Sequence, residues 1–282
     1  MRALSLAALA TALLLCSAAP ALAQAPGPTY YLSLGDSLAR GWQPDPAGIG
    51  RPGNEGYTDV LLESRRGRPG LRAVKLGCPG ETSATMLAGG ICPYRRGTQL
   101  RAAESFLRSH RGRVAFVTIS IGGNDVQRCG ALGTALAAGC AQLAFAGLDR
   151  TMPRIARRLR RAAAGAPVVG LTYYNAFLAL HLRGASGQAQ ALATVPLVAQ
   201  FNARLRRIYR ANRIATADVP RAFSSNELAS VEHVPGFGAL PVAVARVCQW
   251  TWSCAPAPRG PDIHPNASGY RVIAEAVGRS LP

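Results

Sequence analysis

The stretch TYYLSLGDSLARGW, residues 29–42, sets a pattern that recurs along this chain. Its apolar part, Tyr30 to Leu34, is typical of a buried strand, and Gly-Asp-Ser follows at once. Ser37 therefore stands just past the end of a predicted strand. From this stretch alone, Ser37 is either a reactive serine at a strand end or the cap of a following helix.

Four further apolar segments end in turn residues and are also typical of buried strands. They are Arg72 to Leu76, Val114 to Ile121, Pro167 to Thr172 and Ile214 to Val219. Apolar residues at helical spacing lie between them, as in the series Leu148, Met152, Ile155 and Leu159. Alternating strands and helices predict a three-layer α/β/α fold with about five parallel strands. Functional sites in such folds lie at the carboxyl ends of the strands.

Two further series of apolar residues predict helices near the end of the chain. The series in residues 197–208 predicts a helix that begins at Pro196, because proline suits the first helical position. The series in residues 270–281 predicts a last helix with Asn266 as its N-cap. Residues 240–261 are rich in proline and cysteine, and we expect them to form a long loop.

Residues 1–23 are expected to be a secretory signal peptide. Arg2 precedes an apolar run, and Ala21-Leu22-Ala23 forms a small-x-small cleavage signal. The run is shorter than the roughly 20 apolar residues that span a membrane. Cys16 raises the alternative of a lipid anchor, which the bulky Leu15 before it disfavours. We therefore predict a secreted, extracellular protein with a single domain over residues 24–282.

Six cysteines remain after the predicted cleavage, and an even number in an exported chain predicts three disulfides. They are Cys78, Cys92, Cys129, Cys140, Cys248 and Cys254. Six cysteines allow 15 pairings, and the sequence does not choose among them, although the grouping favours 78–92, 129–140 and 248–254. Zinc is the competing interpretation, but no C-x-x-C pair is present. We therefore expect no metal.

The chain is strongly basic, with a formal net charge of +18 at pH 7. The basic residues are nearly all arginines, with Lys75 as the single lysine, and they are scattered over the predicted helices. No zinc finger or recognition helix stands out, so we expect no specific nucleic-acid partner. The charge favours contact with anionic surfaces such as phospholipid. We expect the protein to be a monomer.

Polar groups follow two more predicted strands and precede the last predicted helix. Gly-Gly-Asn-Asp follows the third strand, where glycines allow close approach and Asn124 offers a side-chain N–H. Gly80, after the second strand, can present a backbone N–H in the same region. His264 precedes the last predicted helix and lies two residues after Asp262. This setting suits a general base that is held in one orientation. Alone, each of these is an ordinary turn or cap.

Together and in this order, the four blocks resemble the GDSL family of lipases and esterases, also called SGNH hydrolases. The matching stretches are SLGDSLARGW, LGCPGETS, ISIGGND and PDIHPNASGYRVIAEA. The resemblance extends from about Tyr30 to Leu281. The cysteines and the stretches LTYYNAFL and CQWTWSC are similar to a secreted bacterial branch with three disulfides. The resemblance implies a flavodoxin-like three-layer fold.

The resemblance also implies a role for each marker residue. Ser37 would attack an ester carbonyl, with His264 as general base and then general acid. Asp262 would orient His264. The backbone N–H groups of Ser37 and Gly80 and the side chain of Asn124 would form the oxyanion hole. No cofactor is implied.

Several alternatives stay open at this point. Asp262 lies two residues before His264, where many members of the family have an aspartate three residues before, so a backbone carbonyl from residues 250–252 is the alternative partner. Five aromatic residues either line a groove for the acyl chain or belong to the core: Trp42, Tyr173, Tyr174, Trp250 and Trp252. The leading hypothesis is a secreted esterase or lipase that acts on a small-molecule or lipid ester. The alternatives are a carbohydrate or cell-wall O-acetylesterase and a catalytically inactive secreted binding protein.

Overall fold

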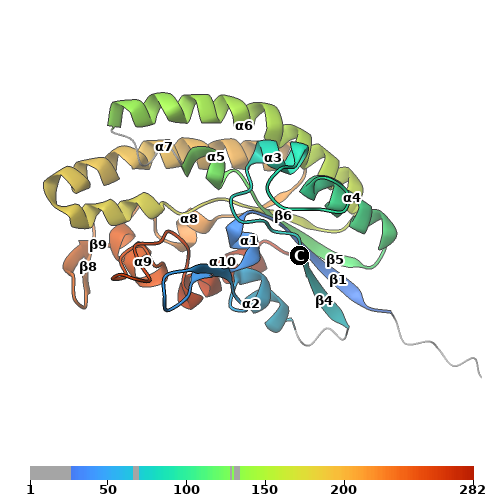
Figure 1. Cartoon of the computed structure of the whole chain (residues 1–282), viewed down its shortest axis with the longest axis horizontal. Coiled ribbons are helices and arrows are strands. Elements are labelled where there is room, and N and C mark those ends of the chain that lie inside the picture. The colour runs from blue at the N-terminus through green and yellow to red at the C-terminus, as the bar shows by residue number, and fades with distance from the viewer. Residues whose placement is uncertain (1–26, 66–69, 128, 130–133) are drawn as a thin grey trace, which may run out of the picture.

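A five-stranded parallel sheet lies at the centre of the molecule. The computed structural model describes residues 27–65, 70–127, 129 and 134–282, so the predicted signal peptide lies outside the described residues. The strands, in their order across the sheet, are β4 (Leu71–Lys75), β1 (Thr29–Gly35), β5 (Val114–Ser120), β6 (Val168–Leu171) and β7 (Ala215–Ala217) (Figure 1). All five were predicted from their apolar segments.

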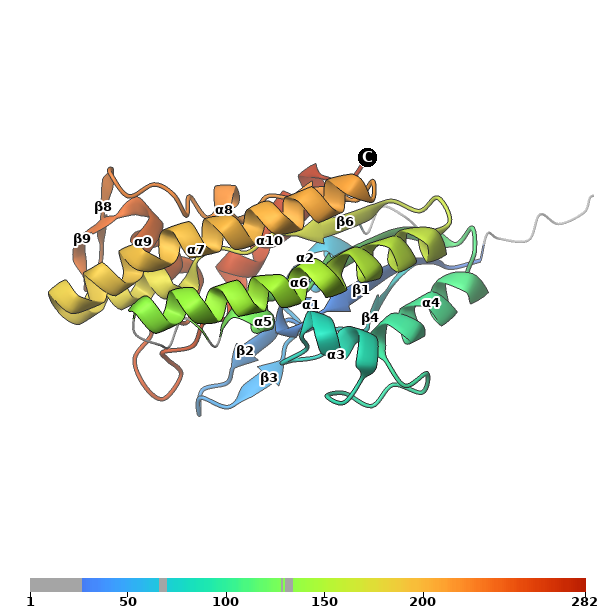
Figure 2. The same ribbon diagram turned by 90° about the horizontal axis from the view of Figure 1, so that it is seen from above.

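Helices cover both faces of the sheet (Figures 1 and 2). One face carries α3 (Ser83–Ala88), α4 (Gln99–Ser109), α6 (Thr134–Ala163) and α7 (Gly184–Ala211). The other carries α2 (Tyr57–Glu63), α8 (Val219–Ala222) and α10 (Ala267–Arg279). Side chains alternate along β1, so that Leu32 and Leu34 pack toward α6 while Tyr31 packs toward α10. The predicted α/β/α layering is confirmed.

The strand order places a crevice where the polar blocks meet. Numbered along the chain, the five strands of the sheet have the order 2-1-3-4-5, which is the flavodoxin-like order. The connections diverge to opposite sides between β1 and β5, and such a switch point leaves an opening at the carboxyl ends of the two strands. Ser37 follows β1 and Asn124 follows β5, so both lie at this opening.

The two long helices α6 and α7 test two helix predictions, of which one is confirmed and the other is wrong at its start. Helix α6 contains the predicted series from Leu148 to Leu159. Helix α7 begins at Gly184, so the predicted start at Pro196 is wrong and the proline lies inside the helix. The preceding turns contain alanine and glutamine, which favour helices, and they bury Ala191. This local preference outweighs the hydrogen bond that a proline cannot donate.

Residues 240–261 are only partly a loop, because Val242–Trp250 forms helix α9. The expectation of a continuous loop is therefore wrong. Helix α9 buries Ala243, Val244 and Val247 against the 3-10 helix η2 (Ala176–Arg183) and a hairpin. The hairpin consists of β8 (Val231–Val234) and β9 (Gly238–Pro241). Valine has a low helix propensity, and this burial overrides it.

The remaining elements are short. They are α1 (Ser37–Arg40), α5 (Gly123–Gln127) and the antiparallel pair β2 (Trp42–Pro44) and β3 (Gly50–Pro52). The predicted cap of the last helix is confirmed, since the Asn266 side chain accepts hydrogen bonds from the N–H groups of Ser268 and Gly269 at 3.0 and 3.1 Å. In the described part of the chain, no helix combines the length and apolar character needed to cross a membrane.

Three disulfides fasten loops that surround the carboxyl edge of the sheet. They join Cys78 to Cys92, Cys129 to Cys140 and Cys248 to Cys254. These are the pairs that the spacing of the cysteines favoured. The first holds the turn that contains Gly80, and the third closes the segment that follows helix α9. The turn that contains Gly80 is therefore held covalently as well as by packing.

Candidate active site

Ser37 is the first residue of helix α1 and follows β1 through a sharp turn. Gly35 has φ +133°, and a side chain there would meet the backbone oxygen of Ser120 at 2.0 Å, so only glycine fits. Asp36 caps the helix by accepting the Leu38 N–H at 3.0 Å. The alternative that Ser37 is the cap of this helix is wrong, because Asp36 is the cap and Ser37 is the first helical residue.

Gln99 of helix α4 fixes the end of β1 through two hydrogen bonds to the backbone of Gly35. Its side-chain oxygen accepts the Gly35 N–H at 2.6 Å, and its side-chain nitrogen donates to the Gly35 carbonyl at 2.9 Å. Gln99 is fully buried, and buried polar groups need such partners. The sequence carries no local signal for this role, because one glutamine at a helix start has no distinctive pattern.

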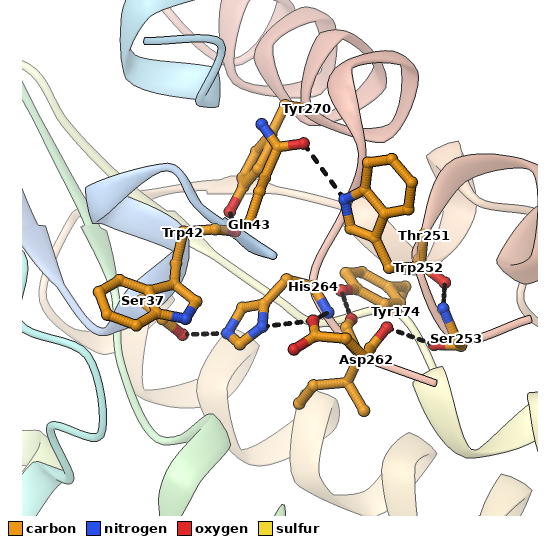
Figure 3. Close-up of polar contacts among 11 residues, drawn as sticks. Ser37, Trp42, Gln43, Tyr174, Thr251, Trp252, Ser253, Asp262, His264 and Tyr270 are labelled. Carbon is orange, nitrogen blue, oxygen red and sulfur yellow. Dashed lines mark hydrogen bonds and ion pairs between the residues drawn. The ribbon is translucent and has the colours of Figure 1, made fainter. Parts of the chain in front are cut away.

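Ser37, His264 and Asp262 form one hydrogen-bonded line (Figure 3). The Ser37 hydroxyl lies 2.8 Å from Nε2 of His264, and Nδ1 of His264 lies 2.7 Å from Oδ1 of Asp262. A carboxylate only accepts, so Nδ1 carries the hydrogen and Nε2 is free to accept the Ser37 proton. The same Oδ1 atom accepts the His264 backbone N–H at 2.8 Å. This line can remove a proton from Ser37.

The backbone around His264 is held from two sides. Trp252 donates its N–H to the His264 carbonyl and accepts the Asp262 N–H, both at 3.0 Å. The Tyr174 hydroxyl donates to the Ile263 carbonyl at 2.5 Å (Figure 3). The carbonyl of Trp252 thus positions the loop, while the carboxylate of Asp262 contacts the imidazole.

The pKa of Asp262 suits a carboxylate beside an imidazole. Burial raises this pKa, but the hydrogen bonds and charge of His264 lower it by more, so the net pKa lies below 3.8. Asp262 is therefore ionised at neutral pH. An ionised carboxylate at this position stabilises the positive charge that His264 gains when it takes a proton.

The three residues expected to form the oxyanion hole are Ser37, Gly80 and Asn124. The Asn124 side chain donates one N–H to the Glu81 carbonyl at 2.9 Å, which leaves its second N–H for a ligand. The same bond ties Asn124 to the turn that contains Gly80, whose φ of +80° favours glycine. Among the described residues, the backbone N–H groups of Ser37 and Gly80 donate no hydrogen bond. Ser37 and Asn124 line one cavity, whereas Gly80 does not line it.

Asp125 holds the Asn124 turn against the next loop. Its carboxylate accepts the Ser83 N–H at 2.8 Å and the Ser83 hydroxyl at 2.6 Å. Burial raises the pKa of Asp125, and the bonds from Ser83 oppose this rise. Asp125 therefore braces this turn through hydrogen bonds to Ser83.

Asp36 is the second buried carboxylate of the site, with 2% of its surface exposed. It accepts hydrogen bonds from the Tyr173 hydroxyl at 2.6 Å, the Leu38 N–H at 3.0 Å and the Ser120 hydroxyl at 3.4 Å. Burial raises the pKa of Asp36 to about 6, against the opposing effect of these bonds. The hydrogen bond from Tyr173 to Asp36 was not predicted, because a single tyrosine after a strand is usually a core residue.

The pKa of Asp36 predicts a dependence of stability on pH. This pKa rises from 3.8 to about 6 on folding, so the folded state binds the Asp36 proton more tightly than the unfolded state does. The bound proton therefore stabilises the fold, fully below pH 4, and this stabilisation is lost as the pH rises through 6. Between pH 4.5 and 7.5 we expect the wild type to lose about 2 kcal/mol of unfolding free energy relative to Asp36→Asn.

Urea unfolding of both proteins at the two pH values, with the disulfides intact, measures this difference. All other titrating groups are shared by the two proteins, so their contributions cancel in the comparison. Equal pH dependence in both proteins would show that Asp36 does not titrate with a raised pKa.

One protein-family model matches most of this chain. Residues 33–272 match the model of the GDSL-like lipase/acylhydrolase family. This range contains Ser37, Asn124, Asp262 and His264. No match was found among the curated proteins.

Solved structures share the fold at low sequence identity. An extracellular lipase from Streptomyces rimosus has a TM-score of 0.60 and 20% identity, covering 89% of this chain and 99% of its own. Phospholipase A1 from Streptomyces albidoflavus NA297 has a TM-score of 0.56 and 18% identity, with 90% and 100% covered. A variant of an acetyl xylan esterase from Geobacillus stearothermophilus has 0.53 and 17%, with 90% and 95% covered.

Proposed function

Because this chain belongs to the GDSL-like lipase/acylhydrolase family, we propose that it hydrolyses carboxylic esters through an acyl-enzyme on Ser37. The observation that carries this proposal is the hydrogen-bonded line from Ser37 through His264 to Asp262, with distances of 2.8 and 2.7 Å. A hydroxyl in contact with a free imidazole nitrogen, which is itself oriented by a carboxylate, is the arrangement of an activated nucleophile.

In the first half of the reaction, the Ser37 oxygen attacks the ester carbonyl and passes its proton to Nε2 of His264. The carbonyl oxygen becomes an oxyanion, for which Ser37, Gly80 and Asn124 supply the N–H donors. The tetrahedral intermediate then breaks its bond to the alcohol oxygen. His264 returns the proton to that oxygen, so the alcohol leaves neutral and the acyl group stays on Ser37.

In the second half, a water molecule takes the place of the alcohol beside His264. His264 accepts a proton from the water as it attacks the acyl carbonyl, and a second oxyanion forms at the same donors. The bond between the acyl carbon and the Ser37 oxygen then breaks, and His264 returns the proton to Ser37. The products are a carboxylic acid and an alcohol, and no cofactor enters the balance.

We further infer that the protein acts outside the cell. Disulfides persist in oxidising compartments, and the chain contains three. The signal peptide predicted over residues 1–23 agrees with export. One of the proteins with the same fold is an extracellular lipase.

An irreversible organophosphate ester tests the nucleophile directly. Incubation with diethyl p-nitrophenyl phosphate is expected to release one p-nitrophenolate per protein molecule and to abolish hydrolysis of p-nitrophenyl acetate. Peptide mass spectrometry should place the diethylphosphoryl group on Ser37, with peptides that carry other serines unmodified. Continued ester hydrolysis without a modified Ser37 would contradict the proposal.

A further inference from the structure

The positive charge of the chain is concentrated in one layer of helices. Residues 95–213 contain 19 arginines and three acidic residues, a net charge of +16 against +18 for the whole chain. This segment includes α4, α6 and α7, which cover one face of the sheet. Figure 2 looks onto this layer, where α6 and α7 run side by side. The rest of the chain is therefore nearly neutral.

Helix α6 presents a basic side that faces away from the sheet. Five of its residues are exposed and are spaced by seven, four, three and four positions: Leu143, Arg150, Arg154, Arg157 and Arg161. This spacing places them on one side of the helix. The opposite side carries the apolar series around Met152 and packs on the sheet. At 1.5 Å per residue, the basic side is about 27 Å long.

Helix α7 repeats this arrangement beside α6. Leu192 is exposed, and the exposed Arg210 follows it after 18 positions on the same side of the helix, as Arg161 follows Leu143. The two helices lead into the parallel strands β6 and β7 and run in the same direction (Figure 2). The two leucines, 78% and 53% exposed, therefore lie toward one end of the layer and the arginines toward the other.

The acidic groups of this layer do not neutralise the basic side of α6. Asp149 binds Arg204 and Arg207 of α7, at 3.5 and 3.1 Å. Glu104 of α4 binds Arg158 with both of its oxygens, each at 2.7 Å. Within the described part of the chain, the four arginines on the basic side of α6 form no ion pair. Like charges one turn apart repel each other, so an external anion would stabilise this side of the helix.

A hollow beside α4 provides a place for a phosphate group. Arg101, Ser105 and Arg108 of α4 and Arg158 of α6 are among the residues that line it. Arginine binds phosphate oxygens through paired hydrogen bonds, and a serine hydroxyl adds a further donor. Glu104 is the one acidic residue in the lining, and its carboxylate is already bound to Arg158.

We propose that the outward side of this layer docks on an anionic phospholipid bilayer. The docking surface, called the arginine face below, consists of the exposed leucines and arginines described above on α6 and α7 and of the hollow on α4. The proposal goes beyond ester hydrolysis and does not rest on it. A single small anion cannot reach along about 27 Å of helix, whereas the phosphates of a bilayer surface are spread over a wide area. The bilayer thus matches the extent of the face.

The two exposed leucines favour a bilayer over a nucleic acid. A helix that lies on a membrane keeps its basic residues at the headgroups and buries apolar side chains at the boundary with the acyl chains. The backbone of a nucleic-acid duplex presents charged phosphates and offers no such apolar layer. Leu143 and Leu192 therefore gain a partner on a bilayer and none on a duplex. Each arginine held near an anionic bilayer strengthens binding by about fivefold.

Co-sedimentation of the full chain with lipid vesicles tests the proposal. All proteins carry Ser37→Ala, so that no ester bond of the lipid is hydrolysed during the measurement. We expect binding to vesicles with about 30% phosphatidylglycerol in phosphatidylcholine at about 50 mM NaCl, and loss of this binding at about 500 mM NaCl. Vesicles of phosphatidylcholine alone measure any binding by apolar segments such as residues 1–23. Equal binding to both kinds of vesicle would overturn the proposal, as would no binding to either.

A triple substitution on α6, Arg154→Gln with Arg157→Gln and Arg161→Gln, should weaken binding to the anionic vesicles about 100-fold. Glutamine is a good helix former, so the fold is kept. The matched control removes the same charge from the opposite layer and the helix α8 beside it, where three exposed arginines are available: Arg221, Arg271 and Arg279. Their change to glutamine should weaken binding less than about threefold. Equal losses in the two triple variants would show a general effect of net charge and would contradict docking through the arginine face.

The leucines separate a bilayer from other polyanions. Leu143→Gln with Leu192→Gln should weaken vesicle binding by about tenfold and leave the affinity for a short DNA duplex, titrated in parallel, within about twofold. Both side chains are exposed, so circular dichroism should show an unchanged fold. Unchanged vesicle affinity in this variant would mean that the face contacts phosphates alone. Bilayer docking would then be wrong, and a polyanion such as a nucleic acid would take its place.

Discussion

Replacing Ser37 with alanine is expected to lower kcat/KM for p-nitrophenyl acetate by about 10⁴-fold or more, without loss of the fold. The hydroxyl that is removed lies 2.8 Å from Nε2 of His264 and is the nucleophile of the proposed acyl-enzyme. The side chain is small and lies at a helix start, so the packing of the core is preserved. Ser64→Ala, on an exposed serine at the end of α2, should keep full activity.

The pairing of Ser37 with His264 predicts that their losses do not add. His264→Ala should reduce kcat/KM about as much as Ser37→Ala, because neither residue works without the other. The double variant should then be no less active than either single variant. Losses that multiply in the double variant would show two independent contributions and contradict the shared step.

Replacing Asp262 with asparagine is expected to lower kcat by about 10²-fold or more at neutral pH. The Oδ1 atom that contacts Nδ1 of His264 at 2.7 Å also accepts the His264 backbone N–H at 2.8 Å. Asparagine would keep its amide oxygen in this place, because an amide nitrogen would face both N–H groups. The negative charge that stabilises the protonated His264 would be lost, so His264 would take the proton of Ser37 less readily although the shape of the site is unchanged.

Steady-state kinetics of Asp262→Asn, with circular dichroism to establish folding, measures this effect. Asp149→Asn is the control, since Asp149 lies exposed on helix α6 and pairs there with Arg207. A loss smaller than about tenfold would mean that the charge of Asp262 does not stabilise the protonated His264, and this would contradict the role proposed for Asp262.

The sheet could be predicted from the sequence because its strands are buried on both faces. Such strands appear as short apolar runs that end in turn residues, and all five runs became strands. Helix α9 and the start of α7 were missed for the opposite reason. Valines at 242–247 and Pro196 disfavour helices locally, and their helices depend on burial against distant parts of the chain. Local patterns do not report such burial.

The same distinction holds for the site. Ser37, Asn124 and His264 stand in short motifs at strand ends or a helix start, so the sequence marks them. Gln99 acts through contacts with a distant segment and carries no motif. Gln99 binds the backbone of Gly35, 64 positions away. The identity of such residues follows from the fold and not from their neighbours in sequence.

The proposed nucleophile and the proposed base lie far apart in the sequence. Ser37 belongs to the first helix, whereas Asp262 and His264 share one loop before the last helix. Ser37 and His264 are separated by 227 positions. A growing chain that has not yet reached residue 264 carries a serine with no partner to activate it. If the proposed mechanism holds, activity requires synthesis to pass residue 264, and a product truncated before it should be inert.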